Sequence, residues 1–167
     1  MKKRPQIFFI SLFSLVFISG YTRAQTTEAP PIVFVASTPC SIGTRPVPGI
    51  PPGQTGCDLI KWNLKLSGDG KSSPRTYVLD CDYGIPKQGT REFINGGKHL
   101  HREGKWTIVK GMHADPSAVV YRLDPDKPLE SISFVRLNEN MIHLLDSDEH
   151  LMNGTGAWSY TLSKVKQ

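Results

Sequence analysis

Short segments in which hydrophobic and polar residues alternate recur along most of the chain. The clearest is segment 60–66, in which Trp62, Leu64 and Leu66 alternate with two lysines and an asparagine. A period of two residues predicts a β-strand with one buried face. Together with the other segments of this kind, it predicts eight strands between residues 59 and 163: 60–66, 77–83, 98–102, 106–109, 119–123, 132–137, 142–145 and 158–162.

The connections between these segments are short and rich in turn-forming residues, such as Asn95–Gly96 and Asp124–Pro125–Asp126. They leave no room for helices that would cross between parallel strands, so consecutive strands should pair antiparallel. The sequence therefore predicts an all-β fold, an eight-stranded antiparallel, lipocalin-like meander barrel. Segment 132–137 departs from strict alternation because Phe134 and Val135 are adjacent, which indicates either a bulge or a strand covered on both faces.

The first 24 residues have the pattern of a secretory signal peptide. A basic start, Lys2 to Arg4, leads into an apolar run from Ile7 to Ile18, and small residues precede Gln25. The run is too short to span a bilayer comfortably, so we expect cleavage near Ala24 and a secreted or periplasmic protein without a membrane span. The segment holds four of the 20 Lys and Arg and none of the 15 acidic residues, so the mature chain has 16 − 15 = +1 net charge. This near-neutral charge gives no reason to expect nucleic acid or an anionic membrane as a partner.

Residues 25–56 are rich in proline and glycine. They carry seven of the 13 prolines and include a short β-like run at 32–35. Proline lacks the N–H group that a sheet interior needs, so we interpret 25–56 as an arm and loop and 57–167 as the barrel domain.

The three cysteines allow one disulfide and leave one thiol over. Cys40 and Cys57 flank the proline-rich loop and are the expected pair. Cys81 shares the inward phase of Leu79 and Tyr83 and should be a buried free thiol. Pairing of Cys57 with Cys81 is the alternative, because both lie near the same end of the first hairpin.

Several short motifs form one pattern: Thr38–Pro39–Cys40, Cys57–Asp58, the strand 62–66, Tyr77 and the strand 104–108. Together they resemble the N-terminal barrel of the NlpE-like copper-resistance and envelope-stress lipoproteins. The C-terminal stretch 141–162 is similar to small, secreted, uncharacterised proteins of Gram-negative bacteria. The resemblance implies a lipocalin-like barrel and, as an alternative function, copper handling or a role in envelope stress. The chain lacks the lipid-anchor cysteine of the family and its Cys-x-x-Cys pair, so copper binding through that pair is not carried over.

The inward-pointing aromatic residues are the candidate lining of a ligand cavity. They are Trp62, Tyr77, Trp106, Phe134, Trp158 and Tyr160. Rings in these positions usually fill the core of a barrel, which is the reading we favour. A barrel of this size can also hold one small ligand, so a cavity is the alternative.

His99 and His101 are the candidate metal ligands. In a strand their side chains share one face, with Cα atoms about 6–7 Å apart. Two imidazoles could hold copper or zinc if a third ligand approached. Because Leu100 between them is the natural inward residue, we expect both histidines on a solvated outer face. We therefore expect no cofactor, with copper as the alternative.

No catalytic motif with defined spacing is present in the sequence, and we predict that the protein is not an enzyme. The leading hypothesis is an exported, non-enzymatic binding module that takes a small apolar ligand or a protein partner in the cell envelope or outside the cell. An NlpE-like role in copper handling or envelope stress is the alternative.

Overall fold

The computed structural model describes residues 29–40, 50, 56–71 and 73–166. The expected signal peptide, residues 1–24, lies outside this part of the chain, as does much of the proline- and glycine-rich segment.

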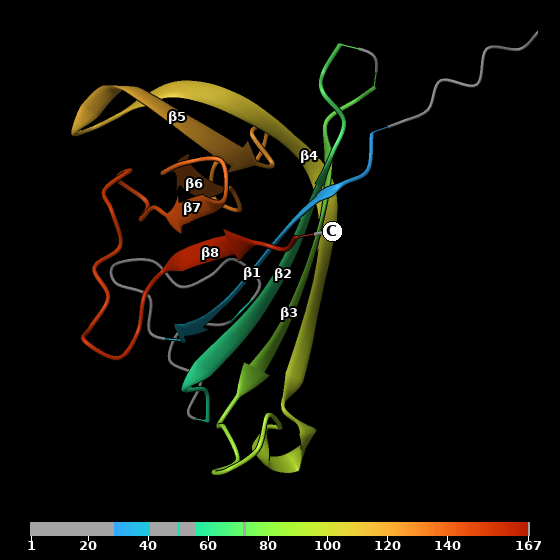
Figure 1. Cartoon of the computed structure of the whole chain (residues 1–167), viewed down its shortest axis with the longest axis vertical. Helices are drawn as coiled ribbons and strands as arrows, with labels where there is room; N and C mark the ends of the chain where they lie inside the picture. The colour runs from blue at the N-terminus through green and yellow to red at the C-terminus, as the bar shows by residue number, and fades with distance from the viewer. Residues whose placement is uncertain (1–28, 41–49, 51–55, 72, 167) are drawn as a thin grey trace, which may run out of the picture.

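Eight antiparallel strands form a closed barrel (Figure 1). Each strand pairs with the next in sequence, and β8 returns to pair with β1. One 3₁₀ turn, η1 (Ile94–Gly96), precedes β4. The strands are β1 (Ile32–Pro39), β2 (Leu59–Ser67), β3 (Thr76–Gly84), β4 (Lys98–Met112), β5 (Asp115–Leu123), β6 (Ile132–Arg136), β7 (Met141–Leu144) and β8 (Thr161–Lys164). The predicted fold class, an eight-stranded antiparallel meander barrel, is confirmed.

Two of the predicted strands form a single strand in the structure. Segments 98–102 and 106–109 both belong to β4, which pairs with β3 up to Lys105 and with β5 from Trp106 onward. Glycine is uncommon inside strands, so Gly104 indicated a break. In the structure only glycine fits at this position without a clash, because a Cβ atom there would lie 2.2 Å from Oδ1 of Asp124. Gly104 thus lets β4 continue past a side chain that occupies the space above it.

The strand that completes the barrel is β1, which lies within residues 25–56, the segment that the sequence predicts to be an arm and loop. All eight residues of β1 pair with β2, from Ile32 with Leu66 to Pro39 with Leu59. The barrel therefore begins at residue 32, and the boundary expected at 57 cuts it between its first two strands. The prolines of this segment argued against a strand in the sequence. In the structure they lie just before β1 and at its last position.

A disulfide joins Cys40, directly after β1, to Cys57, two residues before β2. Their Cα atoms are 5.8 Å apart, and the backbone N–H of Cys40 donates to the carbonyl of Asp58. The predicted pairing is confirmed, and the bridge closes the connection between the first two strands. Cys81 is buried and free, as predicted.

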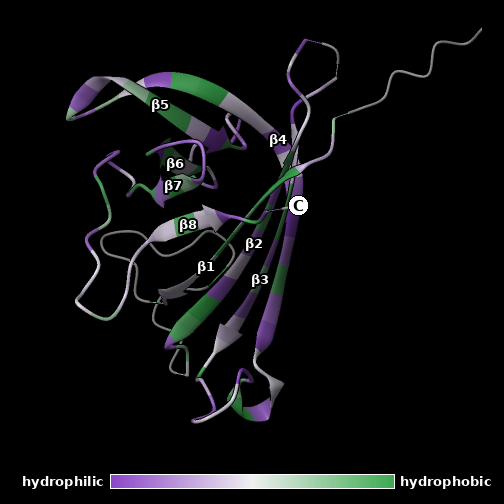
Figure 2. Ribbon diagram, viewed as in Figure 1, coloured by the Kyte–Doolittle hydropathy of each residue, from purple (hydrophilic) through white to green (hydrophobic). Residues whose placement is uncertain are grey.

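Side chains that alternate along the strands fill the interior of the barrel. Buried and less buried residues alternate from Ile60 to Ser67 in β2 and from Thr76 to Tyr83 in β3. Figure 2 shows hydrophobic and hydrophilic bands in succession along β2. Trp62 of β2 meets Phe134 of β6 edge-on, with ring centroids 6.2 Å apart. Because β2 and β6 are not neighbours in the sheet, this contact spans the interior.

Strand β6 is buried on both faces, which explains the adjacent Phe134 and Val135. Phe134 belongs to the barrel core, whereas Val135 packs with Ala118, Val120 and Leu145 in a second, smaller cluster. The hairpin of β4 and β5 arches over β6 and β7 (Figure 1) and contributes residues to this cluster. Of the two alternatives from the sequence, a strand covered on both faces is the one observed.

Candidate functional site

Five of the six aromatic residues predicted to line a cavity are buried in the main core. They are Trp62, Tyr77, Trp106, Phe134 and Tyr160. Trp158 does not join them. It precedes β8, which begins at Thr161 rather than at 158, and 42% of it is exposed. The short alternation Trp158–Tyr160–Leu162 indicated a strand, but the chain approaches β8 through hydrogen-bonded turns between Thr155 and Trp158.

The buried rings are held by specific partners. The indole N–H of Trp62 donates to the hydroxyl of Thr38 at 2.8 Å, and both groups are buried. The indole N–H of Trp106 donates to the carbonyl of Ser67 at 2.9 Å, and its ring meets that of Tyr121. These contacts make the aromatic residues part of the packing, so they are poor candidates for a ligand cavity.

A partly buried polar cluster lies beside Gly104. The hydroxyl of Tyr77 donates to Oδ2 of Asp124 at 2.5 Å, and the guanidinium of Arg102 donates to the same oxygen at 2.7 Å. Burial, followed by the hydrogen bond to Asp124, raises the pKa of Tyr77 well above its ordinary value. The tyrosine is therefore protonated at neutral pH and has little capacity to act as a base. In the sequence Asp124 indicates only a turn, and no local signal points to this cluster.

The thiol of Cys81 is fully buried between the outward-pointing residues Asp80 and Asp82 of β3. Burial first, and these two carboxylates second, raise the pKa of Cys81 to about 12. A thiol in this environment is a weak nucleophile, because the thiolate is the reactive form.

His99 and His101 are exposed on the outer face of β4, as predicted. Each lies opposite a carboxylate of β3, so that Nδ1 of His99 is 2.7 Å from Asp82 and Nδ1 of His101 is 2.6 Å from Asp80. Asp80 also lies near the ring of His99, because its Oδ1 is 3.7 Å from Nε2 of that histidine. Asp80 is therefore a potential third ligand beside the two imidazoles. Sequence alone missed the combination because it depends on the pairing of β3 with β4.

A second group of possible metal ligands consists of Asp146, Asp148 and His150. Here Oδ1 of Asp146 accepts the backbone N–H groups of the other two residues, each at 2.9 Å. This is the geometry of an aspartate that stabilises a turn. The carboxylate has a structural role, which makes this group the weaker metal candidate.

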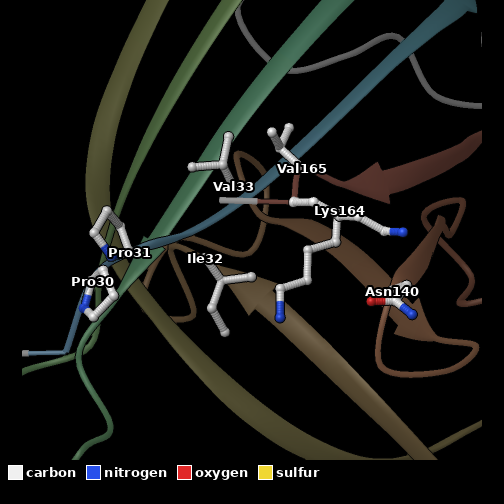
Figure 3. Close-up of a pocket in the computed structure, with 8 residues that line it drawn as sticks. Pro30, Pro31, Ile32, Val33, Asn140, Lys164 and Val165 are labelled. Atoms are coloured by element: carbon white, nitrogen blue, oxygen red, sulfur yellow. The ribbon is translucent and has the colours of Figure 1, made fainter.

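A surface groove of about 440 Å³ lies where β8 closes onto β1. Figure 3 shows Val33 and Val165 together on one side, Pro30 and Pro31 on the other, and Ile32 between them. Polar groups complete the lining at Asn140, Lys164 and Lys166. Among the residues that the structure describes, no carboxylate forms an ion pair with either lysine. The groove is thus apolar with positive charge beside it.

The fold places the protein in the class of closed, eight-stranded antiparallel barrels. Compared with known proteins, the chain matches no family model, no curated protein and no solved structure. The resemblance to the NlpE-like barrels stays a prediction from the sequence motifs. Across the described residues, no helix has the length and apolar character needed to cross a membrane.

Proposed function

We propose that the protein is an exported, non-enzymatic binding module that takes a small ligand with an apolar body and an anionic end. The groove at the junction of β1 and β8 is the observation that carries this proposal. Its volume of about 440 Å³ falls within the range of small-molecule sites, which is roughly 300–1,000 Å³. Because the described side chains of the barrel interior pack against one another, a ligand has better access to this surface groove.

The lining of the groove defines the class of ligand. Valine, isoleucine and proline side chains favour an apolar body, because its burial removes hydrocarbon surface from water. Lys164 and Lys166 favour a carboxylate or another anion at one end. A fatty-acid-like molecule has both features. No catalytic step is part of the proposal, since Cys81 is buried and Tyr77 is held in its protonated form.

Export is supported by the basic and apolar pattern of residues 1–24 and by the disulfide. Disulfides persist in oxidising compartments such as the periplasm or the outside of the cell. We therefore propose that the mature protein begins near Gln25 and is secreted or periplasmic. Expression of the full chain in a Gram-negative host, followed by fractionation and N-terminal sequencing, tests this step. Recovery of the uncleaved chain in the cytoplasm would contradict it.

Calorimetric titration of the mature protein tests the ligand class, with dodecanoate as the ligand and dodecanol as its uncharged counterpart. Ile32→Glu places a negative charge in the groove and should weaken dodecanoate binding by at least about tenfold. The matched control is Ile94→Glu, at a residue that is also exposed but lies in η1, and it should bind like the original protein.

The two lysines are tested separately from the apolar wall. The double variant Lys164→Ala with Lys166→Ala should weaken binding of dodecanoate and leave that of dodecanol nearly unchanged. Lys110→Ala, on the exposed side of β4, is the control. Absence of dodecanoate binding, or equal weakening in the groove variants and their controls, would refute the proposal.

A further inference from the structure

The pairing of β3 with β4 brings four potential metal ligands onto one patch of the outer face of the barrel. Asp80 lies opposite His101, and Asp82 lies opposite His99. Residues two apart in a strand share a face, so all four side chains project to the same side. Cys81 and Leu100, which alternate with them, form the next cross-strand pair and belong to the inner side of the sheet.

We propose that Asp80, His99 and His101 bind a divalent transition-metal ion such as Zn²⁺, with Asp82 beside them as a further carboxylate. The potential ligand atoms of the first three residues all lie within 4.8 Å of one another. Neutral imidazole and carboxylate are ligands that zinc commonly uses in proteins. Zn²⁺ is tetrahedral in most protein sites, and three protein ligands leave a fourth position for water or for Asp82.

The distances are close to those that a bound ion requires. With metal–ligand bonds of about 2.0–2.2 Å, two ligand atoms of a tetrahedral site lie about 3.3 Å apart. The carboxylate oxygen Oδ1 of Asp80 is 2.6 Å from Nδ1 of His101 and 3.7 Å from Nε2 of His99. The required spacing falls between these two values. Small rotations of exposed side chains therefore suffice, and the backbone of the two strands need not move.

The charged residues around the patch decide how readily a cation can bind. Lys65 reaches Oδ2 of Asp80 at 3.9 Å and competes with a metal for this carboxylate. Lys61, which pairs with Asp82 across β2 and β3, is turned away, because its amino group donates to the carbonyl of Arg91 and lies 4.5 Å from the ring of Phe93. The acidic residue Glu103, on the same face of β4, adds negative charge. One lysine thus opposes binding and can be removed as a test.

The two imidazole nitrogens favour a transition-metal ion over calcium and magnesium, because those two ions prefer sites made of oxygen ligands. By the usual order of affinities, Cu²⁺ should bind the same site more tightly than Zn²⁺. The inference is independent of the groove between β1 and β8, since the two sites share no residue.

Calorimetric titration of the mature protein with ZnCl₂ at pH 7.5 is the direct test. We expect one Zn²⁺ per chain, and no binding of Mg²⁺ or Ca²⁺ at the same concentrations. His99→Ala, His101→Ala and Asp80→Asn should each weaken zinc binding by at least about tenfold, since even outer-sphere partners of metal ligands change affinity by about 10–100-fold. The matched control is His150→Ala, which removes an equally exposed imidazole from the second acidic group. It should leave the affinity unchanged.

Lys65→Ala gives a prediction of the opposite sign. Removing the competing amino group should raise the affinity for zinc. Damage to the fold would lower that affinity instead, so the two causes can be told apart. Urea unfolding of each variant without metal verifies that the barrel is intact. Absence of zinc binding at millimolar concentration, or binding that His150→Ala abolishes and His99→Ala does not, would overturn the proposal.

Discussion

Replacing Trp62 by alanine should destabilise the barrel far more than the same replacement at Trp158. Only 2% of Trp62 is exposed, and its ring contacts Phe134 across the interior. Truncating a buried tryptophan typically costs about 3–5 kcal/mol. The variant loses the favourable burial of the ring on folding, and a cavity remains in the core. Trp158 is 42% exposed and outside the strands, so Trp158→Ala should cost less than about 1 kcal/mol.

The assay is urea unfolding followed by far-ultraviolet circular dichroism. This signal reports mainly the backbone, whereas the fluorescence signal would change when a tryptophan is replaced. Similar m-values for both variants would show that the comparison concerns stability alone. A free energy of unfolding lowered equally by the two replacements would refute the assignment of Trp62 to the interior and Trp158 to the surface.

The hydrogen bond of Trp62 can be separated from its packing by a double-mutant cycle with Thr38. Thr38→Val keeps the shape of the side chain but leaves the buried indole N–H without its acceptor, which costs about 1–3 kcal/mol. Trp62→Phe removes the donor and part of the ring. When both partners are replaced, the loss should be smaller than the sum of the two single losses. Strict additivity would show that the 2.8 Å contact does not contribute to stability.

The remaining predictions concern the polar cluster and the cysteines. Asp124→Asn keeps a residue that tolerates the positive φ of 47° but weakens the hydrogen bonds that Tyr77 and Arg102 donate to this side chain. Because Arg102 retains Glu130 at 3.7 Å, urea unfolding should show a loss of about 1–3 kcal/mol. Cys81 should resist iodoacetamide at pH 8 in the native protein and react in urea. Because its folded pKa of about 12 lies above the ordinary thiol value of 9.0, the free energy of unfolding should fall as pH rises from 9 toward 12, and less steeply in Cys81→Ala. Joint replacement of Cys40 and Cys57 by serine should cost about 3 kcal/mol while the circular dichroism spectrum stays that of the barrel.

The alternation of hydrophobic and polar residues by itself determined the all-β class, the inward phase of Trp62 and Cys81, and the outward phase of His99 and His101. Each of these follows from the two-residue period of an extended chain, which is a local property. The Cys40–Cys57 pairing was also accessible, since both cysteines flank one loop. The adjacent Phe134 and Val135 already indicated that β6 could be covered on both faces.

Long-range pairing decided the rest. Whether β1 joined the barrel depended on β2 and β8, which hydrogen-bond to it from distant parts of the sequence. The reason for a glycine at position 104 of β4 depended on Asp124, which occupies the space where a Cβ atom would lie. The meeting of Asp80 with His101 depended on the register between β3 and β4, and a shift of one residue would have turned one side chain of the pair inward. Such contacts arise only when the barrel closes, because no local pattern records which residue of a neighbouring strand lies opposite.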